Sequence, residues 1–380
     1  MIYLDNAATT LRKPPEVAAA VLRAMRDCAN PGRGGYRAAA EAEGRVFETR
    51  RLAGALFGCR PERVCFTANA TEGLNVALRS LLRPGSRALI SGLEHNAVTR
   101  TLRAIGTETE VVRAPLFEPD AWYEAFRRAV ERRPAAVICT QVSNVFGCVL
   151  PTDRIAELCA AREIPLVVDA SQSAGILPVR MDVWKAAFVA MPGHKGLLGP
   201  QGTGLLLCGT DPTPLRFGGT GSQSLLQTMP EALPDRLEAG TLNVPGICGL
   251  GEGLRWLLRQ KPGKLLGTEL ALLRRIAGGL RVLGVEVFAG ENQTGVLSMR
   301  IPGMDPELAA GRFAEAGIAL RGGLHCAPLA HETAGTLPEG TLRLSLSPLT
   351  KQWEADRFLE TAGRLLARET GAAGPDRRKT

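Results

Sequence analysis

Apolar and polar positions along the chain form blocks that favour helices interleaved with short buried strands. Apolar residues at helical spacing predict helices over 15–29, 37–57, 71–82, 120–132 and 152–162, the first with Val17, Val21, Leu22 and Met25 on one face. Short apolar runs predict strands over 64–66, 87–91, 110–112, 135–140 and 165–169. Strands that alternate with helices in this way indicate a parallel or mixed sheet covered on both faces.

The pattern changes near residue 260, where Gln260-Lys261-Pro262-Gly263 interrupts it. Beyond this point we expect helices over 264–283, 306–316 and 352–368, and strands over 285–288, 295–301, 318–321 and 341–345. The chain is therefore predicted to have an N-terminal segment (1–15), a large α/β domain (16–260) and a smaller α+β domain (261–368). Residues 369–380 are polar, and we expect a flexible tail there.

The composition, 45% hydrophobic and 22% charged over 380 residues, is typical of globular proteins and excludes collagen, coiled coils and disordered chains. No window approaches the roughly 18 consecutive apolar residues of a membrane helix. The first residues lack the basic and apolar regions of a signal peptide. We therefore expect a cytoplasmic protein without membrane association.

Cysteine and charge usage narrow the picture further. The nine cysteines are odd in number and widely spaced, without a C-x-x-C, which argues against a disulfide framework or a metal site, and most should be core residues. The net charge of +8 is spread along the chain without a basic run interleaved with aromatic residues. We therefore expect a solvated basic surface, able to dock an acidic protein, rather than stable nucleic-acid binding.

Two segments carry residues suited to catalysis. Lys195 lies among glycines after the apolar segment 186–190, and a bent backbone there would hold it away from water, lower its pKa and favour Schiff-base formation. A surface lysine is the alternative. Asp169 ends an apolar strand, at the sheet edge where open α/β sheets bind ligands, and it would pair with a pyridinium nitrogen or else cap the following turn.

A third segment, 67–73, follows a strand and opens a helix. Its small residues let backbone N–H groups approach a phosphate at the helix N-terminus, although an ordinary N-cap gives the same pattern. The order along successive βα units is more specific than any one segment: a phosphate cradle, then an acid, then a lysine.

With these motifs the chain resembles the fold-type I, class V aminotransferase-like enzymes that use pyridoxal 5'-phosphate, and within them the cysteine desulfurases and selenocysteine lyases. The matching motifs are YLDNAATT (3–10), NPGRGG (30–35), EHN (94–96), SNVFG (143–147), DASQ (169–172), GHK (193–195), EAGT (238–241) and RGGLHC (321–326). The resemblance covers residues 2–367. It implies a large mixed-sheet α/β domain, a smaller C-terminal α+β domain, a homodimer, and an N-terminal segment near the active site.

The resemblance also implies cofactor-binding roles. Lys195 matches the lysine that binds the cofactor covalently, Asp169 the acid facing the pyridine nitrogen, and Gln172 the donor to the phenolic oxygen. His95 matches the imidazole that stacks on the ring and shuttles protons. The phosphate-binding positions match Ala70, Thr71, His194 and, from the other subunit, Thr241.

The resemblance also implies residues for substrate binding and for sulfur transfer. Asn144 and Arg343 match the pair that holds the substrate carboxylate, and a guanidinium fork suits that role. Cys326 matches the desulfurase nucleophile, which needs an exposed thiolate near a cation or base, and His325 is its neighbour. A structural loop cysteine is the alternative. The short stretch to Arg343 resembles the short-loop desulfurases, which are slow without a sulfur-acceptor protein.

Two positions depart from the family pattern. Pro192 replaces a serine that gives a phosphate hydroxyl, so the phosphate must be held by other groups. Leu324 stands where some members have a second histidine, which leaves open how Cys326 is deprotonated. His331 matches no functional position, and we interpret it as a loop residue.

We therefore predict a cysteine desulfurase that converts L-cysteine to L-alanine and leaves a persulfide on Cys326 for an acceptor, with iron–sulfur cluster assembly among the destinations left open. Three alternatives remain at this point. One is a selenocysteine lyase. The second is a class V aminotransferase, epimerase or lyase in which Cys326 is idle. The third is a non-catalytic sulfur-relay or docking protein of the same fold.

Overall fold

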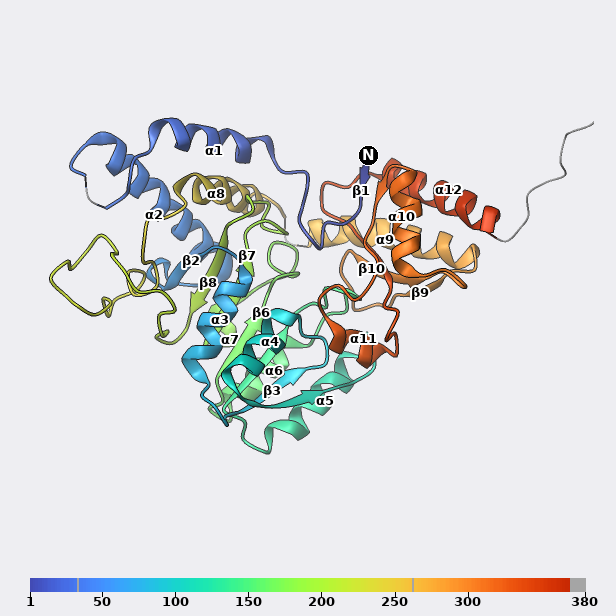
Figure 1. Ribbon diagram of the computed structural model, residues 1–380, viewed down its shortest axis with the longest axis horizontal. Helices are drawn as coiled ribbons and strands as arrows, with labels where there is room; N and C mark the ends of the chain where they lie inside the picture. Colours follow the sequence, from blue (N-terminus) through green and yellow to red (C-terminus); the bar gives the residue numbers. More distant parts are fainter. Residues whose placement is uncertain (33, 262, 370–380) are drawn as a thin grey trace, which may run out of the picture.

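The computed structural model describes residues 1–32, 34–261 and 263–369 (Figure 1). A seven-stranded mixed sheet of order β2-β8-β7-β6-β5-β3-β4 forms its centre, which confirms the predicted mixed sheet. Strands β7, β6, β5, β3 and β4 are parallel, whereas β8 is antiparallel to both of its neighbours. The strands are β2 (Val64–Thr67), β3 (Arg87–Ser91), β4 (Glu108–Val112), β5 (Ala136–Thr140), β6 (Leu166–Asp169), β7 (Phe188–Pro192) and β8 (Gly204–Cys208).

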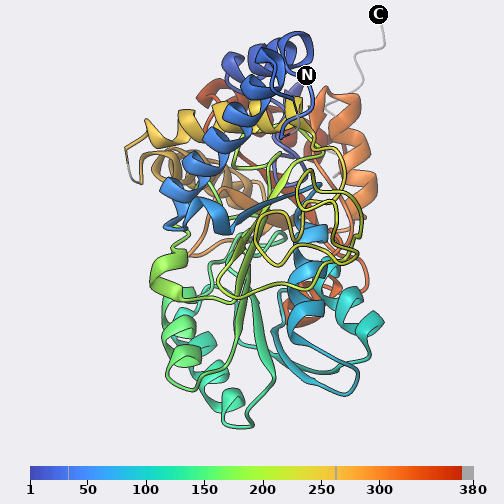
Figure 2. The same ribbon diagram turned by 90° about the vertical axis from the view of Figure 1, so that its left-hand side faces the viewer.

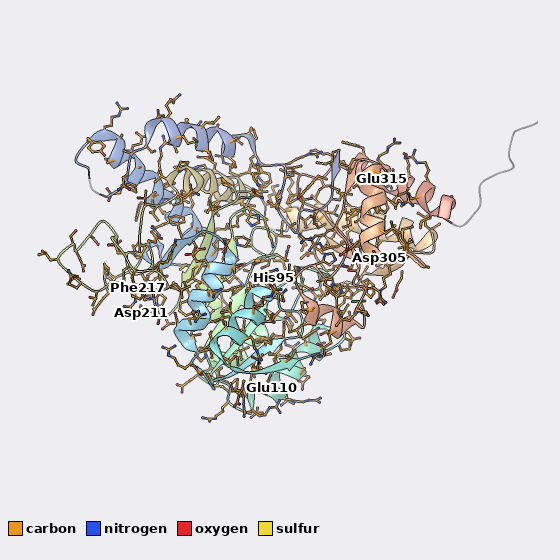
Figure 3. All side chains as sticks on the ribbon, in the orientation of Figure 1. His95, Glu110, Asp211, Phe217, Asp305 and Glu315 are labelled. Atoms are coloured by element: carbon orange, nitrogen blue, oxygen red, sulfur yellow. The ribbon has the colours of Figure 1, made fainter. Side chains whose placement is uncertain are left out.

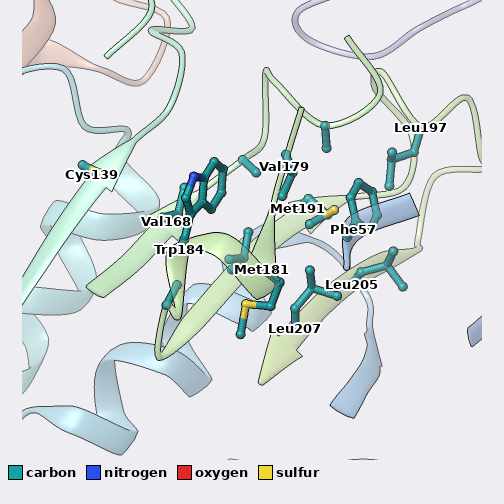
Figure 4. Packing of buried hydrophobic residues seen from close by; sticks show 14 of the residues in the cluster. Phe57, Cys139, Val168, Val179, Met181, Trp184, Met191, Leu197, Leu205 and Leu207 are labelled. Atoms are coloured by element: carbon teal, nitrogen blue, oxygen red, sulfur yellow. The ribbon is translucent and has the colours of Figure 1, made fainter. Parts of the chain in front are cut away.

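Helices cover both faces of this sheet because successive strand residues point to opposite sides. Ile90, Ile138 and Val167 pack with helices α3 and α4, whereas Leu89 and Val168 face the core on the other side. Figure 4 shows part of that second core, where strand residues lie beside Phe57 and Trp184. The helices are α1 (Pro15–Asp27), α2 (Arg37–Phe57), α3 (Ala70–Leu81), α4 (Asn96–Ile105), α5 (Pro119–Val130), α6 (Thr152–Ala160), α7 (Met181–Trp184) and α8 (Val244–Leu258).

A second unit with its own core follows along the chain and lies beside the large sheet (Figures 1 and 2). Its antiparallel sheet has the order β12-β10-β9, from β9 (Glu286–Phe288), β10 (Val296–Arg300) and β12 (Leu342–Ser345). Its helices are α9 (Lys264–Val282), α10 (Pro306–Glu315) and α12 (Gln352–Glu369). The domain limits stay a prediction. Of the tail predicted over 369–380, residue 369 ends α12 and the rest lies outside the described residues.

Two segments connect the second unit with the large sheet, the N-terminal segment and helix α11. Strand β1 (Ile2–Tyr3) pairs in parallel with β11 (Ile318–Ala319), and a few residues later Thr10 bonds to the loop after β7. Helix α11 (Pro328–Ala334) also leaves its own unit: Ala327 and Ala330 pack in the large core. The loop of Cys326, which we assigned to the smaller domain, therefore contacts the large core directly, because those two alanines are apolar and find cover there.

Most predicted elements are confirmed within a few residues, but the buried face of α1 differs from the prediction. Leu22 and Met25 are each 68% exposed, whereas Ala20 and Ala24 are buried. Helix α1 approaches the glycine-rich helix α8 closely: a Cβ on Gly249 would lie 2.7 Å from Cγ2 of Val21. Several elements were not predicted from the sequence, namely α4, α7, α8, α11, β1, β7 and β8. Within the described ranges, no helix is long and apolar enough to cross a membrane.

The glycines of α8 predict an unusual response to alanine. A Cβ on Gly253 would lie 2.3 Å from the carbonyl oxygen of Leu197, so Gly253→Ala should lower the free energy of unfolding by about 1–3 kcal/mol. Gly278→Ala in α9 is the matched control, since no atom lies within 4 Å of its added Cβ, and it should raise stability by up to about 1 kcal/mol. Urea unfolding would measure both. Equal stabilisation by the two substitutions would contradict the close approach of α8.

Candidate active site

The predicted cofactor residues gather at the carboxyl ends of the sheet strands, where open α/β sheets bind ligands. They follow β2, β3, β5, β6 and β7 and line a cavity of about 100 Å³. Figure 3 places one of them, His95, near the middle of the molecule. The predicted site residues that line the cavity are Ala70, Thr71, His95, Asn144, Asp169, Gln172, His194 and Lys195.

Lys195 lies in the bent loop that follows β7. A Cβ on Gly193 would lie 2.1 Å from Oγ1 of Thr203, and a Cβ on Gly196 would lie 2.3 Å from the carbonyl oxygen of Ala174. Only glycine fits such close approaches. The glycines on both sides of Lys195 therefore let the chain fold tightly enough to turn its side chain inward.

Burial lowers the pKa of Lys195 to about 8, and the negative charge of Asp169 partly opposes this fall. Asp169 is 2% exposed and its Oδ1 accepts a hydrogen bond of 2.9 Å from the backbone N–H of Ser171. An amine with this pKa is neutral in an appreciable fraction of molecules near neutral pH, so Lys195 is a competent nucleophile there.

His95 begins α4 and caps it with its own side chain. Its Nδ1 accepts a hydrogen bond of 3.0 Å from the backbone N–H of Ala97, so in the neutral ring Nε2 carries the proton. Burial lowers the pKa of His95, while the carboxylate of Asp169 opposes that shift. The ring is therefore held neutral, with one fixed N–H group beside the cavity.

The N-terminus of α3 is the place where the sequence predicts a phosphate cradle. Asn69 caps the helix by accepting a hydrogen bond from the N–H of Glu72, and the Glu72 side chain accepts one from the N–H of Ala68. The helix N-terminus carries partial positive charge and favours an anion. His194 lies opposite as a neutral group, because burial, followed by the charges of Lys195 and Lys13, lowers its pKa to about 4.

Arg343 and Asn144 contact each other, and Asp5 joins them. Nη1 of Arg343 donates to the backbone carbonyl of Asn144 at 2.9 Å, and Nη2 donates to Oδ1 of Asp5 at 2.7 Å. Nε of Arg343 is buried and has no hydrogen-bond partner among the described residues. This donor is available to a carboxylate. The Asn144 amide, in contrast, donates to the carbonyl of His325 at 2.8 Å.

Cys326 is exposed, unlike the buried cysteines, which are Cys65, Cys139, Cys148, Cys159, Cys208 and Cys248. Its carbonyl accepts a hydrogen bond of 2.7 Å from the N–H of Asn96, which directly follows His95. His325 does not serve as its base: the ring is buried, Nε2 lies 3.0 Å from the carbonyl of Thr341, and burial lowers the pKa of His325 to about 2.

Thr241 lies apart from these residues within the chain. It is exposed and lines a different cavity of about 700 Å³, together with Asn30, Arg50 and Glu238. One chain therefore brings eight predicted site residues around the cavity. Arg343 is hydrogen-bonded to one of them, Asn144. Cys326 is hydrogen-bonded to the neighbour of another, His95, whereas Thr241 lies elsewhere.

Two residues of the site were not assigned a role from the sequence. Asp5 pairs with Arg343 across most of the chain, a contact that no local pattern shows. Glu94 is fully buried beside His95; its Oε1 accepts hydrogen bonds from Ser91 and Thr140. The sequence feature that could have indicated Glu94 is an acidic residue three positions after the apolar strand β3.

Comparisons with known proteins agree with this geometry. The family model for Aminotransferase class-V matches residues 2–358. The chain belongs to the class-V aminotransferase family. A probable cysteine desulfurase of Methanothermobacter thermautotrophicus is 32% identical over 88% of each chain, and one of Pseudomonas aeruginosa is 31% identical over 96% of this chain and 94% of its own. The apo cysteine desulfurase of Thermococcus onnurineus NA1 superposes with a TM-score of 0.88 at 27% identity, covering 97% and 95% of the two chains.

In this class-V member, Glu94 predicts a specific dependence of stability on pH. Burial raises the pKa of Glu94 to about 8, above its value in the unfolded chain, so the group destabilises the fold progressively as the pH rises from about 4.5 to 8. Glu94→Gln removes this titration. The difference in free energy of unfolding, variant minus native, should therefore increase by about 1.4 kcal/mol per pH unit as the pH rises across that window. Urea unfolding at three pH values measures the gap, and parallel profiles would exclude a protonated Glu94.

Proposed function

We propose that the protein is a pyridoxal-phosphate-dependent cysteine desulfurase, with Cys326 as the sulfur-accepting nucleophile. One observation carries this proposal: Cys326 is exposed, and its backbone carbonyl accepts a hydrogen bond from the N–H of Asn96, the neighbour of His95, which lines the cavity together with Lys195 and Asp169. A thiolate that attacks a small substrate needs this combination of exposure and nearness to the substrate site.

The residues around the cavity fit pyridoxal phosphate. The helix N-terminus at Ala70 and Thr71 suits the phosphate, Asp169 suits the pyridine nitrogen, and Gln172 lies on the same strand end as Asp169. Lys195 supplies an amine of lowered pKa. When bound, the cofactor supplies an electron sink that stabilises negative charge at the α-carbon of an amino-acid substrate.

The protein groups have distinct tasks in this proposal. Arg343, through its unpartnered Nε, binds the substrate carboxylate. Lys195, in its neutral form, accepts the proton from the α-carbon. His95, with its proton on Nε2, holds a fixed donor over the same region. Burial of these groups keeps water from competing with them.

Sulfur transfer then balances without an external oxidant or reductant. The thiolate of Cys326 attacks the substrate sulfur, an S–S bond forms, and the bond between that sulfur and the substrate β-carbon breaks. A proton replaces sulfur on the β-carbon, so L-cysteine and the Cys326 thiol yield L-alanine and a Cys326 persulfide. The exposed position of Cys326 suits delivery of the terminal sulfur to an acceptor protein.

The exposed thiol and the relatives named cysteine desulfurase favour this function over a transaminase or lyase with an idle Cys326. Selenocysteine would fit the same residues and is the alternative substrate to compare. A cytoplasmic location is part of the proposal, since nine free cysteines suit a reducing compartment.

We also propose a homodimer in which Thr241 serves the partner's phosphate site. Thr241 is exposed beside the 700 Å³ cavity, and large apolar side chains are exposed in the same region of the sequence. Phe217 is 76% exposed and Leu225 is 97% exposed. A second copy would cover such apolar surface.

Substitution of the nucleophile tests the function. Cys326→Ala should abolish alanine formation from L-cysteine and protein-bound persulfide, while the absorbance of the loaded cofactor stays unchanged, because only the sulfur-accepting thiol is lost. Cys59→Ala removes a half-buried thiol elsewhere and should keep both activities. Alanine and persulfide would be measured with excess thiol reductant. Unimpaired sulfur transfer by Cys326→Ala would refute the role of Cys326.

A charge on the exposed apolar segment tests the dimer. Leu225→Asp should shift sedimentation at micromolar concentration toward the monomer and weaken cofactor retention, because a buried carboxylate at an interface is costly. Val282→Asp is the control: Val282 is 87% exposed at the end of α9 and should leave the dimer intact. A native protein that sediments as a monomer would contradict this arrangement.

A further inference from the structure

The turn that carries Cys326 has an unusual backbone. His325 has a φ of 50° and Cys326 a φ of 57°, so two consecutive residues with side chains lie in the left-handed region. Each such residue costs on the order of 1 kcal/mol or more, and it persists where the surroundings hold it. Something in the structure must therefore stabilise this turn.

Hydrogen bonds hold both residues of the turn. The N–H of Asn96 donates to the carbonyl of Cys326, and the Asn144 amide donates to the carbonyl of His325. The His325 ring is turned inward, with Nε2 donating to the carbonyl of Thr341. The orientation of that ring is thus coupled to the left-handed conformation of the turn.

His331 supports the inward-turned ring from the other side. It is fully buried on α11, and its ring centroid lies 5.7 Å from that of His325 and 5.8 Å from that of Phe146. Its Nδ1 lies 2.7 Å from Oγ1 of Thr336, whose N–H donates to the carbonyl of His331 at 2.8 Å. A polar side chain is thus fixed in a core position directly behind the turn. The interpretation of His331 as a loop residue is wrong.

Neither ring acts as the base for Cys326. Burial lowers the pKa of His331 to about 4. Both imidazoles are neutral at physiological pH, and the His331 ring is fully buried near the rings of His325 and Phe146. The contribution of His331 must therefore come from packing and orientation.

We propose that His331 is a positioning residue for sulfur transfer: held by Thr336 and Phe146, it supports the His325 ring and so maintains the left-handed turn that presents Cys326. This proposal rests on the proposed function, in which Cys326 is the nucleophile. In this proposal His331 helps to position Cys326 in a chain that has Leu324 where some family members have a second histidine.

His331→Ala in the cofactor-loaded enzyme tests the proposal. We expect kcat for alanine formation to fall about tenfold, with KM for L-cysteine changed less than about threefold. A tenfold fall corresponds to the free energy needed to hold one residue in a strained backbone conformation. Alkylation of Cys326 by iodoacetamide, followed by peptide mass spectrometry, should slow at least about threefold. Thr336→Val, which removes the bond to Nδ1, should shift both readouts in the same direction.

Phe313→Leu is the control for general loss of stability, because Phe313 is buried in the core of the second unit, stacked on Phe358. It should lower the unfolding midpoint while leaving kcat and the alkylation rate of Cys326 unchanged. Alkylation does not depend on desulfuration, so a failure of the proposed function would leave this readout interpretable.

A double-mutant cycle separates positioning from a general structural effect. Glycine adopts positive φ without strain and has no ring to support, so adding His331→Ala to His325→Gly should change kcat less than twofold. Additive losses in the cycle would overturn the proposal. Native kcat and native alkylation of Cys326 in His331→Ala would overturn it as well.

Discussion

The ion pair between Asp5 and Arg343 is the contact on which the site depends. It joins the first residues of the chain to strand β12, and the same guanidinium binds the carbonyl of Asn144 at the end of the large sheet. Arg343 is buried and Asp5 is partly buried, so loss of Asp5 would leave a buried guanidinium without its ion-pair partner. The pair therefore keeps the N-terminal segment, the second unit and the sheet edge together around one cavity.

Burial sets the protonation of the groups around that cavity. Lys195, His95 and His194 all have lowered pKa values because the cavity excludes water, and Glu94 has a raised one for the same reason. Asp169 limits the fall for Lys195 and His95. The site thus contains neutral imidazoles and a lysine amine that is partly deprotonated near neutral pH, beside one buried carboxylate, which suits proton transfer at the α-carbon of an amino acid.

Local patterns in the sequence were sufficient for the strand-end residues. Asp169 and Lys195 each follow an apolar strand, and parallel strands bring such positions to one edge without further information. Contacts between distant segments could not be predicted in this way. Asp5 with Arg343 depends on how β1 and β12 are placed by packing. His331 with His325 is close in sequence but depends on how α11 packs. The predicted face of α1 was also wrong at Leu22 and Met25, which are exposed, because helical spacing alone does not show which side of the helix meets α8.

The occupied donors of Arg343 limit which substrates fit. Nη1 and Nη2 are already bonded to Asn144 and Asp5, so an incoming carboxylate meets the guanidinium through Nε or displaces Asp5. Because the Asn144 amide holds the turn before Cys326, a carboxylate that recruits this amide would also disturb the nucleophile turn. Substrate binding and thiol presentation therefore share one side chain, which couples the two halves of the proposed reaction.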